Sequence, residues 1–156
     1  MSDSDALHRF LFEGTHVRGE LVHLDASWRA VLTRHPYPET VRGPLGEALA
    51  ATVLLTGTLK FDGALILQIQ GEGPLRTLVA QATHGRTIRG LARWEGQVPA
   101  GTIEAVFGPG RLVLTLEPER GECYQGIVPL FGANLAEALE TYFRTSEQLG
   151  TRLWLA

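Results

Sequence analysis

The stretch PLGEALAATVLLTGTLK, residues 44–60, decides the fold of this chain. Proline is tolerated in the first turn of a helix, so we expect a helix that begins near Pro44 and runs to about Lys60. Apolar side chains occupy nearly every face of it: Leu45, Leu49, Ala50, Val53, Leu54, Leu55 and Leu59. A helix that is apolar all round is buried all round, so other layers of structure must cover it on both sides.

After this helix the chain changes to short apolar runs separated by turns that contain glycine or proline. We expect strands at 65–70, 75–83, 87–94, 102–107, 111–116 and 124–130. A spacing of about ten residues per strand, with turn residues between strands, is typical of an antiparallel meander.

The N-terminal part of the chain predicts two further strands and a helix. The strands are expected at 7–12 and 15–24, and the second alternates only partly and has a solvated face. A short helix follows, for which Asp25 and Ser27 are candidate caps and which Pro36 stops. Residues 35–40 form a rigid connector, because two prolines hold the chain extended.

The C-terminal part predicts one amphipathic helix and one strand. Asn134 begins the helix and Glu137 follows three residues later, which is a capping-box arrangement. Gly150 is the expected stop, and residues 151–155 form a final strand. Strands followed by helices, without strict alternation of the two, are typical of the α+β class.

Composition excludes several functional classes. The chain has 156 residues, 44% of them apolar and 20% charged, which indicates one globular domain rather than disorder. The net charge of −3 argues against a nucleic-acid-binding face and against a polybasic membrane anchor. Because the N-terminus lacks a secretory signal and no apolar stretch is long enough to span a bilayer, we expect a soluble protein of the cytoplasm.

Catalytic signatures are weak in this sequence. The loop Gly71-Glu72-Gly73-Pro74 is rich in glycine, but Pro74 lacks an N–H group and Glu72 would repel phosphate, so a hairpin turn is favoured over a phosphate cradle. The five histidines form no paired metal-binding motif. Cys123 is the single cysteine, so one chain forms neither an internal disulfide nor a zinc site built from several thiolates.

We therefore predict no catalytic, cofactor or metal site in this chain. The alternative is a small metabolic enzyme on an α+β scaffold that uses the loop from Gly71 to Pro74 and one of the histidines. A saturable small-molecule ligand would favour this alternative.

Three aromatic residues lie at the edges of expected strands: Trp94, Phe107 and Trp154. Large aromatic side chains are usually buried in the core. They also form exposed apolar faces through which proteins bind other proteins. On the second interpretation, these three residues are candidates for a surface that binds other proteins.

Eight stretches, in one order along the chain, resemble the 33 kDa chaperonin family of redox-regulated heat-shock chaperones. They are LHRFLFEG (7–14), VRGELV (17–22), HPYP (35–38), LLTGTLKFDG (54–63), QGEGPL (70–75), IRGLAR (88–93), GECYQGIV (121–128) and YFRTSEQLGTRL (142–153). Each stretch alone is a weak signal, but together they cover essentially the whole chain and are highly specific.

The resemblance implies an ATP-independent holdase, not an enzyme, that captures unfolding proteins in the bacterial cytoplasm during oxidative and heat stress. It also implies helices held between two sheets. We therefore predict an α+β fold with two mostly antiparallel β-sheets packed around a buried central helix, and a C-terminal amphipathic helix. We expect residues 1–156 to form the single N-terminal chaperone domain of the family.

The resemblance also indicates what this chain lacks. In the family a helical linker and a zinc domain with four cysteine ligands follow, and these have no counterpart here. Zinc binding and the redox switch are therefore expected only in a longer parent protein, with no cofactor in this chain.

The expected partners are unfolded or partly folded client proteins and a second copy of the chain. If 151–155 is a strand without a neighbour, its edge is open, and open edges recruit other strands. We therefore predict a homodimer, for which exchange of identical segments between protomers is one low-cost form.

Overall fold

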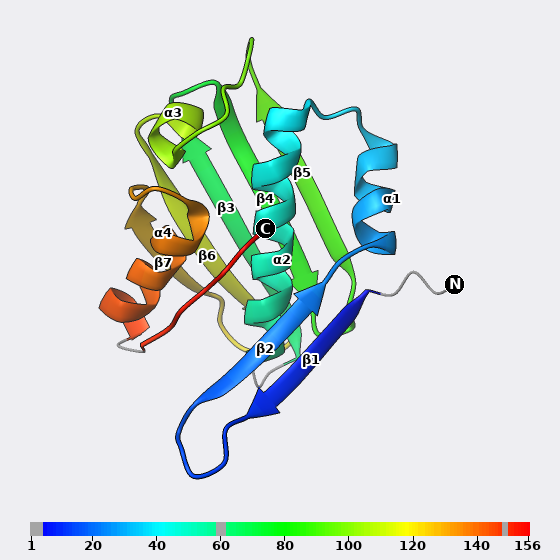
Figure 1. Cartoon of the computed structure of the whole chain (residues 1–156), viewed down its shortest axis with the longest axis vertical. Coiled ribbons are helices and arrows are strands. Elements are labelled where there is room, and N and C mark those ends of the chain that lie inside the picture. Colours follow the sequence, from blue (N-terminus) through cyan, green and yellow to red (C-terminus); the bar gives the residue numbers. More distant parts are fainter. Residues whose placement is uncertain (1–4, 59–61, 148–149) are drawn as a thin grey trace.

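A five-stranded antiparallel sheet forms one layer of the computed structural model, which describes residues 5–58, 62–147 and 150–156 (Figure 1). Its strand order is β5-β4-β3-β6-β7. The strands are β3 (Gly63–Gly71), β4 (Leu75–Thr83), β5 (Ile88–Trp94), β6 (Gly110–Pro118) and β7 (Tyr124–Pro129). These strands confirm the predicted antiparallel sheet, but the predicted meander is only partly right, because β6 pairs with β3 rather than with β5.

Helix α2 (Glu39–Thr58) lies on one face of this sheet, with α1 (Ala26–Arg34) and α4 (Leu135–Tyr142) beside it (Figure 1). A Cβ atom on Gly90 of β5 would lie 3.1 Å from Leu49 Cδ1, so the absence of a side chain there lets helix and sheet approach closely. The helix begins before the predicted start at Pro44, because Pro38 O already accepts bonds from Val41 N and Arg42 N. The predicted end near Lys60 lies outside the described residues.

A second, two-stranded sheet lies across the C-terminal end of α2 (Figure 1). It is the antiparallel hairpin of β1 (Ala6–Leu11) and β2 (Arg18–His23). A Cβ atom on Gly57 of α2 would lie 3.1 Å from Leu7 Cδ2, and Arg9 Nη2 donates to Gly57 O at 2.6 Å. Because α2 contacts both sheets, the predicted arrangement of two sheets around a central helix is confirmed.

The cap of α1 (Ala26–Arg34) comes from a residue distant in the sequence. The Asp5 carboxylate accepts from Asp25 N at 2.7 Å, from Ser27 N and from the Ser27 hydroxyl. Asp25 occupies the cap position but makes no side-chain capping bond. Asp25 is thus the N-cap residue as predicted, but the predicted side-chain cap is supplied by Asp5 rather than by Asp25 or Ser27.

Helix α4 (Leu135–Tyr142) begins as predicted. Asn134 Oδ1 accepts from Glu137 N at 2.9 Å, as predicted. Glu137 Oε2 accepts at 2.7 Å from Ala133 N, one residue before the N-cap, so the capping box is present in a shifted form. Instead of continuing to Gly150, the helix passes into the π-helical turn η1 (Phe143–Glu147). A Cβ atom on Gly126 of β7 would lie 2.7 Å from the Tyr142 ring, so α4 packs closely on this edge of the sheet.

Residues 102–107, predicted as a strand, form a helix instead. Helix α3 spans Ile103–Phe107, and Thr102 Oγ1 caps it by accepting from Ala105 N at 3.2 Å. Ile103, Val106 and Phe107 are buried at the i, i+3, i+4 spacing of one helical face. An apolar run this short fits both the two-residue period of a strand and the 3.6-residue period of a helix. The capping bond to Thr102 Oγ1 favours the helix.

Residues 151–155 also differ from the prediction, because they form no strand. This segment runs toward α2 and ends in front of it (Figure 1), and Leu153 and Leu155 pack against the core. Trp154 between them is exposed. The segment is extended because it packs on side chains, not because it belongs to a sheet.

Candidate protein-binding surface

The structure does not bring the three candidate aromatic residues together. Trp94 is half-buried at the end of β5, and its ring centroid lies 5.8 Å from those of both His35 and Tyr37. Phe107 is 3% exposed and belongs to the core. Trp154 is 79% exposed on the C-terminal segment. The interpretation of Phe107 as an exposed residue is therefore wrong, because α3 turns its ring inward.

The exposed ring of Trp154 lies beside a salt bridge. Arg152 Nε lies 3.2 Å from Glu140 Oε2 of α4, and the Arg152 guanidinium carbon lies 5.9 Å from the Trp154 ring centroid. A guanidinium at this distance attracts the face of an indole ring. Helix α4 therefore helps to position an aromatic surface that is open to other molecules.

A larger apolar surface lies on the β1–β2 hairpin. We call it the hairpin patch; its members, all exposed, are Phe10, Leu11, Phe12, Val17 and Leu21. The rings of Phe10 and Phe12 pack edge to face with centroids 5.8 Å apart. By alternation along β1, Leu11 points to the face opposite to that of Phe10, so the patch extends over both faces of the hairpin. Exposed apolar surface of this kind is typical of protein-binding sites.

The hairpin patch arises because the hairpin turns a charged pair toward α2. Arg9 Nε lies 3.2 Å from Glu20 Oε1, and the Glu20 side chain is only 13% exposed. Burial raises the pKa of Glu20, although Arg9 and Arg18 favour its ionised form. Since neighbouring residues of a strand point to opposite faces, Leu21 next to Glu20 points outward. The solvated face predicted for 15–24 is therefore partly apolar.

A row of five residues crosses the sheet on the face away from α2; four are apolar, Gln68 is polar, and Val113 is buried. Register partners connect Leu91 to Val79, Val79 to Gln68, Gln68 to Val113, and Val113 to Ile127. We call these five residues the open-sheet row. Its end members are the most open: Leu91 is 41% exposed and Ile127 is 58% exposed.

The neighbouring row of residues shows that this face is opposite to the helices. It runs from Gly90 through Ala80, Leu67 and Leu114 to Gly126. Its terminal glycines lie against α2 and α4, as the close approaches to Leu49 and Tyr142 show. Because a shift of one residue reverses the face, the open-sheet row points away from both helices.

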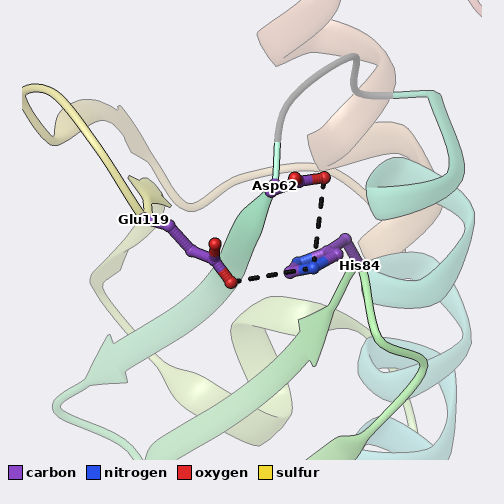
Figure 2. Close-up of side chains that lie close together, drawn as sticks. All are labelled: Asp62, His84 and Glu119. Carbon is purple, nitrogen blue, oxygen red and sulfur yellow. Dashed lines mark ion pairs between the residues drawn. The ribbon is translucent and has the colours of Figure 1, made fainter.

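Three side chains at one end of the sheet could in principle hold a metal ion (Figure 2): Asp62, His84 and Glu119. All are exposed, and His84 Nε2 lies 4.0 Å from Asp62 Oδ1 and 3.7 Å from Glu119 Oε1. However, Gly63 N donates to His84 Nδ1 at 2.9 Å. A neutral ring that accepts at Nδ1 carries its proton at Nε2, which then faces the carboxylates rather than a metal. The cluster therefore connects the turns at the ends of β3, β4 and β6.

The glycine-rich loop of the enzyme alternative is also occupied by backbone contacts. Glu72 N donates to Pro109 O at 2.9 Å, and Gly73 N donates to Phe107 O at 2.6 Å. A Cβ atom on Gly73 would lie 2.6 Å from the Phe107 carbonyl carbon, so glycine is needed for this packing. Its amide groups bind the neighbouring turn and are not directed at a phosphate.

The fold is an α+β domain whose described surface exposes apolar side chains on a hairpin and on the two edge strands of a sheet. The chain belongs to the Hsp33 family, a family of chaperones: the family model described as Hsp33 protein matches residues 5–156. Among the described residues, none of the helices is both long and apolar enough to cross a membrane.

Relatives and a solved structure agree with this membership. The chain is 65% identical over 155 residues to the 33 kDa chaperonin of Nitrosococcus oceani, covering 99% of this chain and 54% of that protein. It is 52% identical to the 33 kDa chaperonin of Photobacterium profundum, covering 97% and 52%. The crystal structure of the Thermotoga maritima 33 kDa chaperonin aligns with a TM-score of 0.84 at 26% identity, covering 94% and 52%. The chain thus spans about half the length of these relatives.

Proposed function

We propose that this chain is the substrate-binding domain of an ATP-independent holdase. It captures unfolding polypeptides on the hairpin patch and the open-sheet row and keeps them from aggregating. The exposure of five large apolar side chains together on one hairpin carries this proposal. Such clusters on small domains mark sites that bind other proteins.

The binding chemistry follows from these surfaces. Unfolded clients expose apolar side chains, and each Å² of apolar surface removed from water contributes about 25 cal/mol. Since this gain needs no directional chemistry, sequence-diverse clients bind, and release needs only a competitor for the same surface. Membership of a chaperone family supports this mechanism.

We assign zinc and redox control to the longer parent protein, acting in the cytoplasm under heat and oxidative stress. A thiolate zinc site needs several cysteines, and this chain has one, the exposed Cys123. The residues of this chain therefore do not fit such a site. Client capture by this domain is expected to be independent of zinc and of oxidant.

Light scattering of guanidinium-unfolded citrate synthase, diluted with and without the purified chain and without ATP, tests the proposal. We expect the chain to suppress aggregation at a stoichiometric ratio. The double variant Phe10→Ser/Phe12→Ser should lose most of this effect, and Leu91→Ser/Ile127→Ser should lose part of it. Arg89→Ser, an exposed substitution on β5, is the matched control. Equal activity in all four proteins would contradict the proposed surfaces.

A further inference from the structure

A cavity of about 460 Å³ lies between α2, α3 and the start of α4, away from the hairpin patch and the open-sheet row. Apolar side chains from several elements line it, among them Ile103, Phe107 and Leu135. Its volume lies within the range of about 300–1,000 Å³ found for ligand pockets. Phe107, which is 3% exposed and belongs to neither binding surface above, is one of the residues that form the wall of this cavity.

The charge in this cavity is negative. Glu39 and Glu47, two turns apart on one face of α2, both line it, and none of its described lining residues is Lys, Arg or His. Glu47 is half-buried and makes no hydrogen bond or ion pair with any described residue. Burial raises the pKa of Glu47, since the ionised form loses hydration there.

An anion does not fit this cavity. Thr102 Oγ1 accepts the α3 amide of Ala105 at 3.2 Å, and Asn134 Oδ1 accepts the α4 amide of Glu137 at 2.9 Å. The Ala133 amide beside α4 donates to Glu137 Oε2 at 2.7 Å. Because these amides are already used by the capping side chains, they are not available to a phosphate or carboxylate. Two carboxylates that line the cavity, those of Glu39 and Glu47, have no partner among the described residues, and that of Glu47 is half-buried.

We propose that this cavity binds a basic side chain of a polypeptide, with the cationic group beside Glu47 and the aliphatic stem against the apolar wall. Long basic side chains bury their methylene groups along apolar surface while the charge meets a carboxylate. The cation restores the electrostatic stabilisation that burial removes from Glu47. This site is independent of the holdase activity, and each can fail without the other.

An NMR titration of the ¹⁵N-labelled chain with the peptide acetyl-Leu-Arg-Leu-amide tests the proposal. We expect shifts of the amides of Gly101, Thr102 and Asn134, which line the cavity. The counterpart with citrulline, a neutral isostere of arginine, should bind about tenfold more weakly, as expected for the loss of one charge-assisted contact. Acetyl-Leu-Lys-Leu-amide tests whether an ammonium replaces the guanidinium, and binding of either basic peptide at these amides supports the proposal.

Two variants identify the site in the same titration. Glu47→Gln should weaken the arginine peptide about tenfold and leave the citrulline peptide unchanged. Gly43→Leu should abolish binding of both, since a Cβ on Gly43 meets no atom within 4 Å and the longer side chain extends into the cavity region. Glu104→Gln on α3, which does not line the cavity, is the matched control.

Circular dichroism and thermal unfolding establish that each variant is folded before binding is measured. Equal binding of the arginine and citrulline peptides would overturn the proposal. Equal losses of affinity for the arginine peptide in Glu47→Gln and Glu104→Gln would also overturn it. The affinity would then depend on the net negative charge of the domain and not on the carboxylate of Glu47.

Discussion

The ring of Phe10 lies over Gly19 on the neighbouring strand of the hairpin. The two residues are register partners, and a Cβ atom on Gly19 would lie 2.2 Å from Phe10 Cζ. An aromatic ring thus fills the space that a side chain on the glycine would occupy, a known way to stabilise glycine within a sheet. Phe10 is also 46% exposed, so the same ring stabilises the hairpin and belongs to its apolar patch.

Gly19→Ala should displace this ring and weaken the hairpin. We expect the free energy of unfolding to fall by about 0.5–1 kcal/mol, because a cross-strand aromatic contact is lost. Urea unfolding measures it. Gly43→Ala, at a helix position where a Cβ meets no atom within 4 Å, is the control and should not be destabilised. A Gly19→Ala variant as stable as the parent would show that the ring contact contributes nothing.

Phe107 and Trp154 should behave in opposite ways when truncated. Phe107→Ala removes a core ring that is 3% exposed, so the free energy of unfolding should fall by about 3–5 kcal/mol. Trp154→Ala, at a side chain 79% exposed, should change it by less than about 0.5 kcal/mol and should reduce client capture. Thermal unfolding and the aggregation assay separate the two. Unchanged client capture by Trp154→Ala would remove this residue from the surface.

The capping box of α4 should be measurable as stability. Asn134→Ala removes the acceptor for Glu137 N and should lower the free energy of unfolding by about 1 kcal/mol. Asn134→Asp keeps an acceptor and is the matched control, with little change expected. If both variants lose the same amount in urea unfolding, the bond is not the cause.

Glu20 should make the stability of the domain depend on pH. Burial raises its pKa in the folded state, so the folded protein holds this proton more tightly than the unfolded chain. The stabilisation from this proton is fully present below the unfolded pKa and is lost as pH rises through the raised folded pKa. Urea unfolding over a pH series should show this loss in the parent and not in Glu20→Gln. A pH profile unchanged by the substitution would contradict the role of Glu20.

The homodimer was predicted from an open strand edge at 151–155, but the unpaired edges of the structure belong to other strands. The extended segment 151–155 forms no strand, so it does not present the edge of a sheet with which a strand of a second copy would pair. Within the described residues, β1 and β2 each have one unpaired edge, as do β5 and β7. We expect a dimer by light scattering at micromolar concentration, shifted toward monomer in Phe10→Ser/Phe12→Ser. If the unsubstituted chain is a monomer, these edges are protected from pairing with the strands of a second copy.

The larger part of the fold can be predicted from the sequence, because the period of the apolar residues and the positions of the turn residues indicate the same elements there. Strand 75–83 was predicted with the bounds of β4, and the capping box begins α4 as expected. Residues 102–107 and 151–155 were predicted wrongly for one reason. A short apolar run fits both a strand and a packed helix or segment, and only tertiary neighbours distinguish them.

The candidate surface was less predictable. Aromatic type alone selected Phe107, which is buried, and missed the hairpin patch. Alternation in β2 identifies two faces but not which one meets the helix. That choice depends on the approach of the hairpin to Gly57 and on the Arg9–Glu20 pair, contacts between residues far apart in the chain.

The attachment of the hairpin to the last turn of α2 also divides the domain into parts that open separately. Elements held by few contacts exchange their amide hydrogens through local opening, at a lower free energy than the core. Amides of β1 and β2 should therefore exchange well before those of β3 and β4, which lie inside the five-stranded sheet. On warming, the element that carries Phe10 and Phe12 would become mobile while the sheet stays folded. Heat alone would then give clients a more adaptable surface on an intact scaffold.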